Sequence, residues 1–228
     1  DFAEAHFNLG IALQELGNPD EATACHRRAI ALKPDNNLFW AGLAASVDSL
    51  SFTSVDDNLR QDLWDLLSKP TVPLYQLIRP IIAVLRHNPD FAALLNTEDT
   101  EEQVGAAYAS AAEKLSSIPL LLRLMALSVI NDLEVEAMLT RLRRSMILAL
   151  DAGISADDET CLPFSAALAL HCFANEYVFG ETEEESAAVE RLGENIAMAM
   201  TCGQAVPATS LAALAAYRPL YRFAWAKD

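Results

Sequence analysis

The sequence predicts an all-α protein in which one helix–turn–helix unit packs on a larger helical domain without repeats. Glycine and proline are scarce, with 8 and 10 residues among 228. Long segments are instead rich in Ala, Leu and Glu, which favour helices. Apolar residues recur at helical spacing along most of the chain, and no stretch alternates as a β-strand does. With 52% hydrophobic residues, the chain can bury a substantial core.

The first two helices are predicted at residues 2–16 and 19–32. Gly17 ends the first one, because glycine readily takes the left-handed conformation of a C-cap. Pro19 begins the second, since proline is favoured in the first helical turn. Pro34 ends it by moving the preceding residue out of the α-helical region.

The stretch 3–36 resembles the tetratricopeptide repeat, a two-helix unit of about 34 residues. Five signature positions hold the residue typical of that family: Leu9, Gly10, Ala22, Ala29 and Pro34. Three positions differ from the usual aromatic residues: His6, Leu13 and His26. Leu13 stays apolar, and the two histidines are either packing residues or small functional features. Packing is favoured because the aromatic shape is kept.

The pattern restarts one period later, in residues 37–50, with Trp40, Leu43, Ala44 and Val47 at matching positions. No second helix with the expected Ala and Pro follows. We therefore interpret 37–50 as the first helix of a degenerate repeat that also caps the unit. Stable arrays need about three repeats, so either the remaining chain packs on this unit or further repeats precede it. The predicted domains are 1–50 and 51–228.

The second domain is expected to be helical but not repetitive. Helices are predicted over residues 56–68, 89–95, 99–116, 120–130, 133–150, 163–179, 183–201 and 207–216. Pro80 should break or kink the chain before residue 89. Helix 163–179 is apolar nearly all round, which predicts a buried central helix. Thr182 and Glu185 have the spacing of a capping box.

The formal net charge of −16 argues against nucleic acid or an anionic membrane as partner. Two arginine clusters are expected to lie on solvated helix faces beside acids: Arg27 with Arg28, and Arg141 with Arg143 and Arg144. The four cysteines form no C-x-x-C pair, which favours reduced thiols in a cytoplasmic protein. The longest apolar run, 161–174, is too short to span a bilayer, so a soluble chain is expected.

Motifs that carry chemistry are missing from the sequence. It has no H-E-x-x-H, G-x-S-x-G, P-loop or G-x-G-x-x-G stretch, so we expect no catalytic residue, metal or cofactor. The most unusual cluster is His171, Asn175 and Glu176 on the nearly apolar helix. It is either a polar network that fixes helix register or a ligand or catalytic site at Glu176. The structural reading is favoured.

The resemblance to tetratricopeptide repeats implies that the first helices line a concave face that binds protein or peptide partners. Here that face would carry Glu4, Phe7, Ile11, Gln14, Ala41, Ala45 and Asp48. Phe7 and Ile11 occupy positions where some repeats hold a carboxylate clamp, so an apolar partner is expected. Whether the face is open or filled by the chain's own helices stays undecided.

A longer resemblance covers residues 39–54, 121–148, 171–185 and 211–222. These stretches are similar to the helical region of bacterial proteins that fuse tetratricopeptide repeats to a class I S-adenosylmethionine-dependent methyltransferase domain. The resemblance implies a non-catalytic interaction module that recruits substrate to a methyltransferase domain beyond residue 228. The chain lacks the family's Gly-rich strand–turn–helix, so no cofactor-binding residue carries over. A free-standing adaptor and an enzyme with a site around His171, Asn175 and Glu176 are the alternatives.

Overall fold

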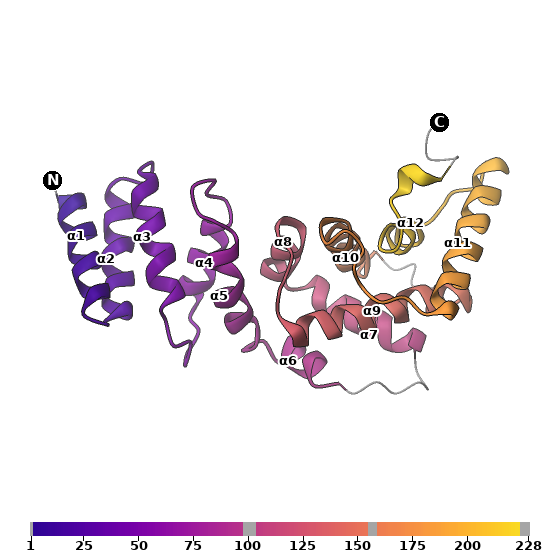
Figure 1. Ribbon diagram of the computed structural model, residues 1–228, viewed down its shortest axis with the longest axis horizontal. Helices are drawn as coiled ribbons and strands as arrows, with labels where there is room; N and C mark the ends of the chain where they lie inside the picture. The colour runs from indigo at the N-terminus through magenta and orange to yellow at the C-terminus, as the bar shows by residue number, and fades with distance from the viewer. Residues whose placement is uncertain (1, 98–103, 155–158, 224–228) are drawn as a thin grey trace. The chain divides into compact units, whose positions relative to one another are not determined.

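The computed structural model describes residues 2–97, 104–154 and 159–223. They belong to two compact units, Asp1–Asn88 and Pro89–Asp228, called here the N-terminal and C-terminal units. Both units are built from α-helices, and the described residues contain no β-strand (Figure 1). The predicted all-α class is thus confirmed. Across the same residues, no helix has the length and apolar character needed to cross a membrane.

The described residues of the N-terminal unit form five helices in sequence order. They are α1 (Phe2–Glu15), α2 (Pro19–Leu32), α3 (Asn37–Asp48), α4 (Asp57–Leu66) and α5 (Tyr75–Leu85). The turn between α1 and α2 contains Gly17 at φ 79°, a left-handed conformation that glycine adopts without steric cost. Helix α3 packs on α2 and also contacts α1, while α5 packs on α3 and α4.

The boundary between the units lies after Asn88, whereas the sequence placed it near residue 50. Helix α3 accounts for the difference, because Phe39, Leu43 and Val47 are at most 1% exposed and α3 packs on α5 as well as on α2. Helix α5 provides further cover for α3. Helices α4 and α5 therefore complete the core begun by the repeat.

Pro80 does not end a helix, in contrast to the prediction from the sequence. It lies inside the continuous helix α5 and is itself buried. Proline in a helix interior costs about 3 kcal/mol through a lost hydrogen bond and a clash. The apolar face of α5 offsets that cost, since Leu77 and Ile81 are both completely buried.

The C-terminal unit contains seven α-helices among its described residues, followed by a short 3₁₀ turn. They are α6 (Pro89–Leu95), α7 (Val104–Ser116), α8 (Pro119–Leu127), α9 (Leu133–Asp151), α10 (Leu162–Ala174), α11 (Glu183–Thr201), α12 (Ala208–Ala215) and the turn η2 (Leu220–Arg222). Helix α10 packs against α7, α8 and α12, and α9 packs against α6, α7, α11 and α12. The predicted start of α7 near residue 99 lies outside the described residues.

Helix α10 is shorter and less buried than predicted. It ends at Ala174, and the next residues turn, with Glu176 at φ 52° and Tyr177 at φ 58°. Its expected burial on all sides is also wrong, since Leu170 is 52% exposed and Phe173 58% exposed. One face of the central helix is therefore open.

The start of α11 follows the sequence prediction closely. The Thr182 side chain accepts a hydrogen bond from the Glu185 backbone, and Glu185 accepts one from the Thr182 backbone N–H. This capping box satisfies two backbone donors that a helix start otherwise leaves unpaired. It also places the Glu185 side chain, which is only 2% exposed, inside the unit.

Candidate functional site

The predicted partner face lies on the neighbouring helices α1 and α3. Six of its seven residues are partly or fully exposed: Glu4, Ile11, Gln14, Ala41, Ala45 and Asp48. Phe7 is the exception, because it is 7% exposed and its ring lies 5.1 Å from that of Phe39. Phe7 therefore belongs to the core. Ile11 remains 38% exposed, so its side chain is accessible on this face.

Both carboxylates of this face already have a cationic partner within the N-terminal unit. Lys33 Nζ donates to Glu4 Oε1 at 2.7 Å, and Arg79 Nη2 donates to Asp48 Oδ1 at 3.0 Å. The hydrogen bond from Lys33 lowers the pKa of Glu4. The remaining accessible residues of the face are uncharged. A surface of this kind fits an apolar partner better than a strongly charged one.

His26 is a packing residue at the junction of α1, α2 and α3. It is completely buried, and its Nδ1 lies 2.9 Å from Ser46 Oγ on α3. The ring occupies space that side chains at Gly10 and Gly42 would fill. A Cβ at Gly10 would lie 2.6 Å from His26 Nε2, and one at Gly42 would lie 2.9 Å from that nitrogen. Burial lowers the pKa of His26, which favours the neutral ring.

His171, Asn175 and Glu176 do not converge. His171 is buried, with Nδ1 3.3 Å from the Ser128 carbonyl oxygen, and burial lowers its pKa. Asn175 is the C-cap of α10, and Glu176 is exposed in the following turn. No hydrogen bond joins the three side chains within the part of the chain that is described. The geometry therefore gives neither a histidine–carboxylate pair nor a shared network.

The buried polar cluster of the C-terminal unit is instead formed by Arg143, Glu185 and Tyr217. Each is at most 2% exposed. Arg143 Nη2 lies 3.6 Å from Glu185 Oε1, and the Tyr217 hydroxyl donates to the same oxygen at 2.6 Å. The Arg143 guanidinium also donates to the Gly180 carbonyl and lies 4.2 Å from the centre of the Tyr217 ring. The cluster joins α9, α11 and the segment that follows α12.

The buried position of Arg143 contradicts the prediction that the arginine cluster lies on a solvated helix face. Its neighbour Arg144 is exposed and pairs with Glu184, as expected of a surface residue. Arg143 faces inward, one residue earlier on the helix, because successive helical residues point about 100° apart. The sequence around the arginines could not show which of Arg143 and Arg144 is buried, since the partner Glu185 lies on another helix.

Three of the four cysteines are buried. These are Cys25, Cys161 and Cys172, while Cys202 is exposed. Burial raises the pKa of Cys172 to about 12, so its thiol stays protonated at neutral pH and is a poor nucleophile. In the described ranges, no three His, Cys, Asp or Glu side chains are grouped as a metal ion requires.

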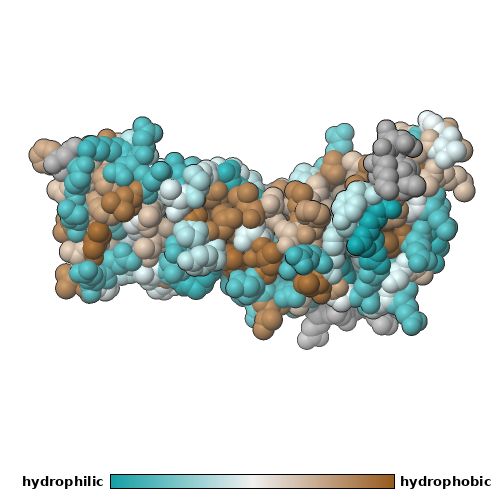
Figure 2. All heavy atoms as spheres, turned by 45° about the horizontal axis from the view of Figure 1, so that its top comes forward, coloured by the Kyte–Doolittle hydropathy of each residue, from teal (hydrophilic) through white to brown (hydrophobic). Residues whose placement is uncertain are grey.

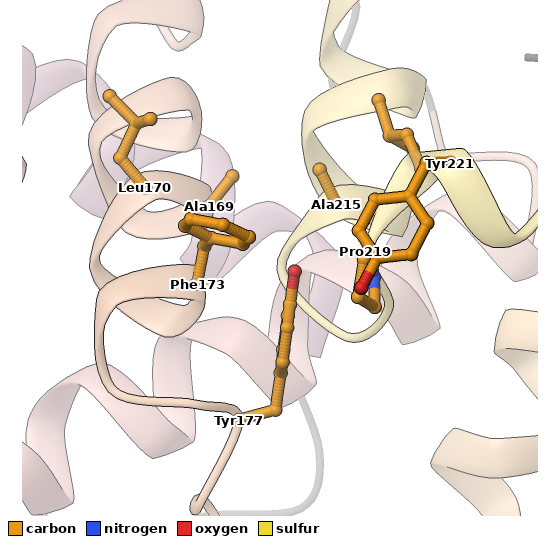
Figure 3. A pocket seen from close by; sticks show the side chains of 8 residues that line it. Ala169, Leu170, Phe173, Tyr177, Ala215, Pro219 and Tyr221 are labelled. Carbon is orange, nitrogen blue, oxygen red and sulfur yellow. The ribbon is translucent and has the colours of Figure 1, made fainter.

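An open pocket lies on the exposed face of α10, and sequence reasoning missed it. It has a volume of about 240 Å³ and is called here the aromatic pocket. Figure 3 shows that the labelled side chains come from α10, the turn after it, α12 and the segment around Pro219. Its lining residues are Ala169, Leu170, Phe173, Tyr177, Ala215, Pro219, Leu220 and Tyr221. One feature of the sequence could have indicated the pocket. Helix α10 is apolar nearly all round, so it has more apolar surface than its neighbours cover.

The rings of the aromatic pocket stand at different orientations. Phe173 and Tyr177 are nearly perpendicular, at 82° with centroids 6.4 Å apart. Figure 3 shows Tyr177 edge-on between α10 and α12, and Tyr221 with its face toward the viewer. Apolar patches also interrupt the hydrophilic surface on the visible face of each unit (Figure 2). Contiguous exposed apolar surface marks interaction surfaces or ligand-binding grooves.

Comparison with known proteins identifies part of the N-terminal unit. Residues 3–36 match the family model of the tetratricopeptide repeat. No curated protein and no solved structure matches the chain. Repeats of this family generally mediate protein–protein interactions, and their all-helical fold is typically non-catalytic. The paired helices α1 and α2, with α3 stacked upon them, are the structure expected of such a unit.

Proposed function

We propose that this chain is a non-catalytic helical interaction module that binds a protein or peptide partner through the face of α1 and α3. One observation carries the proposal. Adjacent helices of a tetratricopeptide unit leave Ile11 and Ala45 exposed on the predicted partner face. Both carboxylates of the face are paired internally, so binding would rest on apolar contact and shape.

The finer proposal is that the module recruits substrate to a methyltransferase domain in a cytoplasmic protein. It is supported only by the resemblance of residues 39–54, 121–148, 171–185 and 211–222 to such fusion proteins. The coding sequence beyond residue 228 tests it. An Asp-x-Gly-x-Gly-x-Gly stretch after a predicted strand would support the fusion, while a stop codon would leave a free-standing adaptor.

The partner face is tested by affinity capture with single substitutions. We expect Ile11→Glu and Ala45→Glu each to abolish capture of a partner that the unchanged chain retains, because a carboxylate cannot be buried against apolar surface without a counter-charge. Leu32→Glu is the matched control, since Leu32 is 54% exposed on α2 and outside the predicted face. Circular dichroism verifies that all three variants fold.

Equal capture by the Ile11→Glu variant and the Leu32→Glu control would contradict the proposed face. The non-catalytic assignment has its own test, namely calorimetry of the chain with S-adenosylmethionine. We expect no binding heat, because the sequence lacks the Gly-rich strand–turn–helix of such cofactor sites. Saturable heat would overturn the assignment.

A further inference from the structure

We propose that the partner face of α1 and α3 is disassembled in mild acid, because a proton taken up by the buried His26 ring releases α1 from α2 and α3. This regulation rests on the proposed function, since it acts on the same face. A partner bound at neutral pH would then be released in acid.

The His26 ring lies between the two helices that carry the face, although His26 itself belongs to α2. A Cβ added at Gly10 of α1 would lie 2.6 Å from Nε2 of the ring, and one at Gly42 of α3 would lie 2.9 Å from it. Nδ1 lies 2.9 Å from Ser46 Oγ, also on α3. Beside each of these three residues stands a residue of the partner face: Ile11, Ala41 and Ala45. The ring therefore sets the spacing of α1 and α3 directly beneath the face.

The surroundings of His26 suit a neutral ring. The side chain is completely buried, and among the described residues its Nε2 atom has no hydrogen-bond partner. Protonation would make both ring nitrogens donors and add a full charge. A charge buried without a counter-charge is strongly unfavourable. Burial accordingly lowers the pKa of His26, while the backbone of Phe7 opposes that shift less strongly.

No carboxylate is placed to compensate a charged His26 ring. Among the described residues, no charged side chain contributes to the shift of its pKa. Three ion pairs occupy charged groups of the helices around it, namely Glu4 with Lys33, Arg27 with Asp62, and Asp48 with Arg79. The remaining ionisable side chains of α1, α2 and α3 are His6, Glu15, Asp20, Glu21, Cys25 and Arg28. A proton on the ring is therefore stabilised only if water reaches it.

Water reaches the His26 ring only if α1 or α3 moves. Helix α3 packs on α2 and α5, whereas α1 has its principal contacts with α2 and α3 (Figure 1). Movement of α1 therefore leaves the packing of α3 with α2 and α5 in place. It also separates the helix that carries Ile11 from the helix that carries Ala45. Apolar contact with both residues at once, on which partner binding is proposed to depend, is then lost.

The sign of the pH dependence follows from the two states of the ring. In the open state the hydrated His26 ring should have the ordinary pKa of 6.5, and in the closed state its pKa is lower. The closed state is therefore fully favoured above about pH 6.5 and loses its advantage as pH falls towards the lower pKa. Because one proton is involved, the ratio of open to closed chains should rise about tenfold for each pH unit in that range.

The test is amide hydrogen exchange followed by nuclear magnetic resonance between neutral pH and mild acid. Each rate is divided by that of an unstructured amide at the same pH, so the ratio reports opening alone. We expect protection of the α1 amides to fall about tenfold for each pH unit below about 6.5, and that of the α5 amides to stay constant. His26→Phe, which keeps an aromatic ring but binds no proton, should abolish the pH dependence. His6→Phe is the matched control on α1 and should retain it.

Three results would overturn the inference. The first is protection of α1 that does not change with pH in the unchanged chain, a measurement that needs no variant to fold. The second is an equal loss of protection in α5, which would mean unfolding of the whole unit. The third is a pH dependence that persists in His26→Phe or disappears in His6→Phe. The proposed function fails separately, through capture at neutral pH that is unaffected by Ile11→Glu.

Discussion

The two units bury polar side chains in opposite ways. In the N-terminal unit the buried polar residues are uncharged in their ordinary state at neutral pH, with His26 bonded to Ser46 beneath two glycines. In the C-terminal unit the buried Arg143 lies against Glu185. Both arrangements connect three segments of a helical core. One depends on close packing, and the other on a compensated charge.

This difference shows how each core specifies its helix arrangement. The His26 ring fits only because Gly10 and Gly42 leave room for it, so the repeat is determined by shape. Arg143 requires Glu185, Tyr217 and the Gly180 carbonyl together. A buried charge with one partner removed is strongly destabilising. The C-terminal unit should therefore tolerate changes of shape better than changes of charge.

The largest effect is expected from Arg143→Met. It leaves the buried Glu185 without its cation and should lower the free energy of unfolding of the C-terminal unit by about 3–5 kcal/mol. Amide hydrogen exchange in α9 and α11 measures the loss, while amides of α1 and α2 should be unchanged. The matched control is Arg144→Met, whose exposed pair with Glu184 should contribute about 1 kcal/mol or less. Equal losses in the two variants would refute the difference between the units.

A smaller effect is expected from Gly10→Ala. Alanine is the better helix former, but its Cβ would lie 2.6 Å from His26 Nε2, so we expect a net loss of about 1–3 kcal/mol from overpacking. Urea unfolding followed by the fluorescence of Trp40 and Trp64, in a Trp225→Phe background, measures the N-terminal unit. In the double variant Gly10→Ala/His26→Ala the clash is removed, so adding Gly10→Ala to His26→Ala should cost less stability than Gly10→Ala alone.

Gly180→Ala is the control for this packing argument, because an added Cβ there meets no atom within 4 Å. Its effect on the C-terminal unit should be close to zero by hydrogen exchange. If Gly10→Ala has an equally small effect, then the close fit of the His26 ring against Gly10 does not specify the packing of α1, α2 and α3.

The smallest effect concerns pH. Burial lowers the pKa of His26 from its usual 6.5 in the folded state, so the unfolded chain takes up a proton first as pH falls. The stability contributed by the neutral ring is complete above about pH 6.5 and is lost as pH falls from there through the folded pKa. Thermal unfolding of the N-terminal unit, followed by tryptophan fluorescence, should therefore shift to lower temperature in mild acid. His26→Phe should remove that shift, and a shift persisting in this variant would assign it to another group.

Local signals in the sequence were sufficient to predict most helices. The capping box of Thr182 and Glu185, the turn at Gly17 and the proline start at Pro19 all act within a few residues. Each was visible without knowledge of tertiary contacts. The end of α10 was missed because no glycine marks it. The apolar residues Tyr177, Val178 and Phe179 follow soon after Asn175, where the helix already ends.

The features of the candidate sites that could not be predicted from the sequence are those that depend on tertiary contacts. The partner-face residues were placed by repeat position, yet only the packing with Phe39 shows that Phe7 is buried. Arg143 resembles its neighbours in sequence, and its partner Glu185 is remote. The aromatic pocket forms between α10 and the segment around Pro219, so no local pattern could reveal it.

The turn after α10 places backbone stability and the lining of the aromatic pocket in opposition at a single position. Glu176 and Tyr177 both hold left-handed backbone conformations, which cost about 1–2 kcal/mol for each L-residue. Directed evolution for heat resistance alone should therefore favour glycine or asparagine at both positions. At position 177 that gain would remove a ring of the aromatic pocket. A lineage kept only under thermal selection should drift away from tyrosine, whereas one that must keep the pocket intact should retain it.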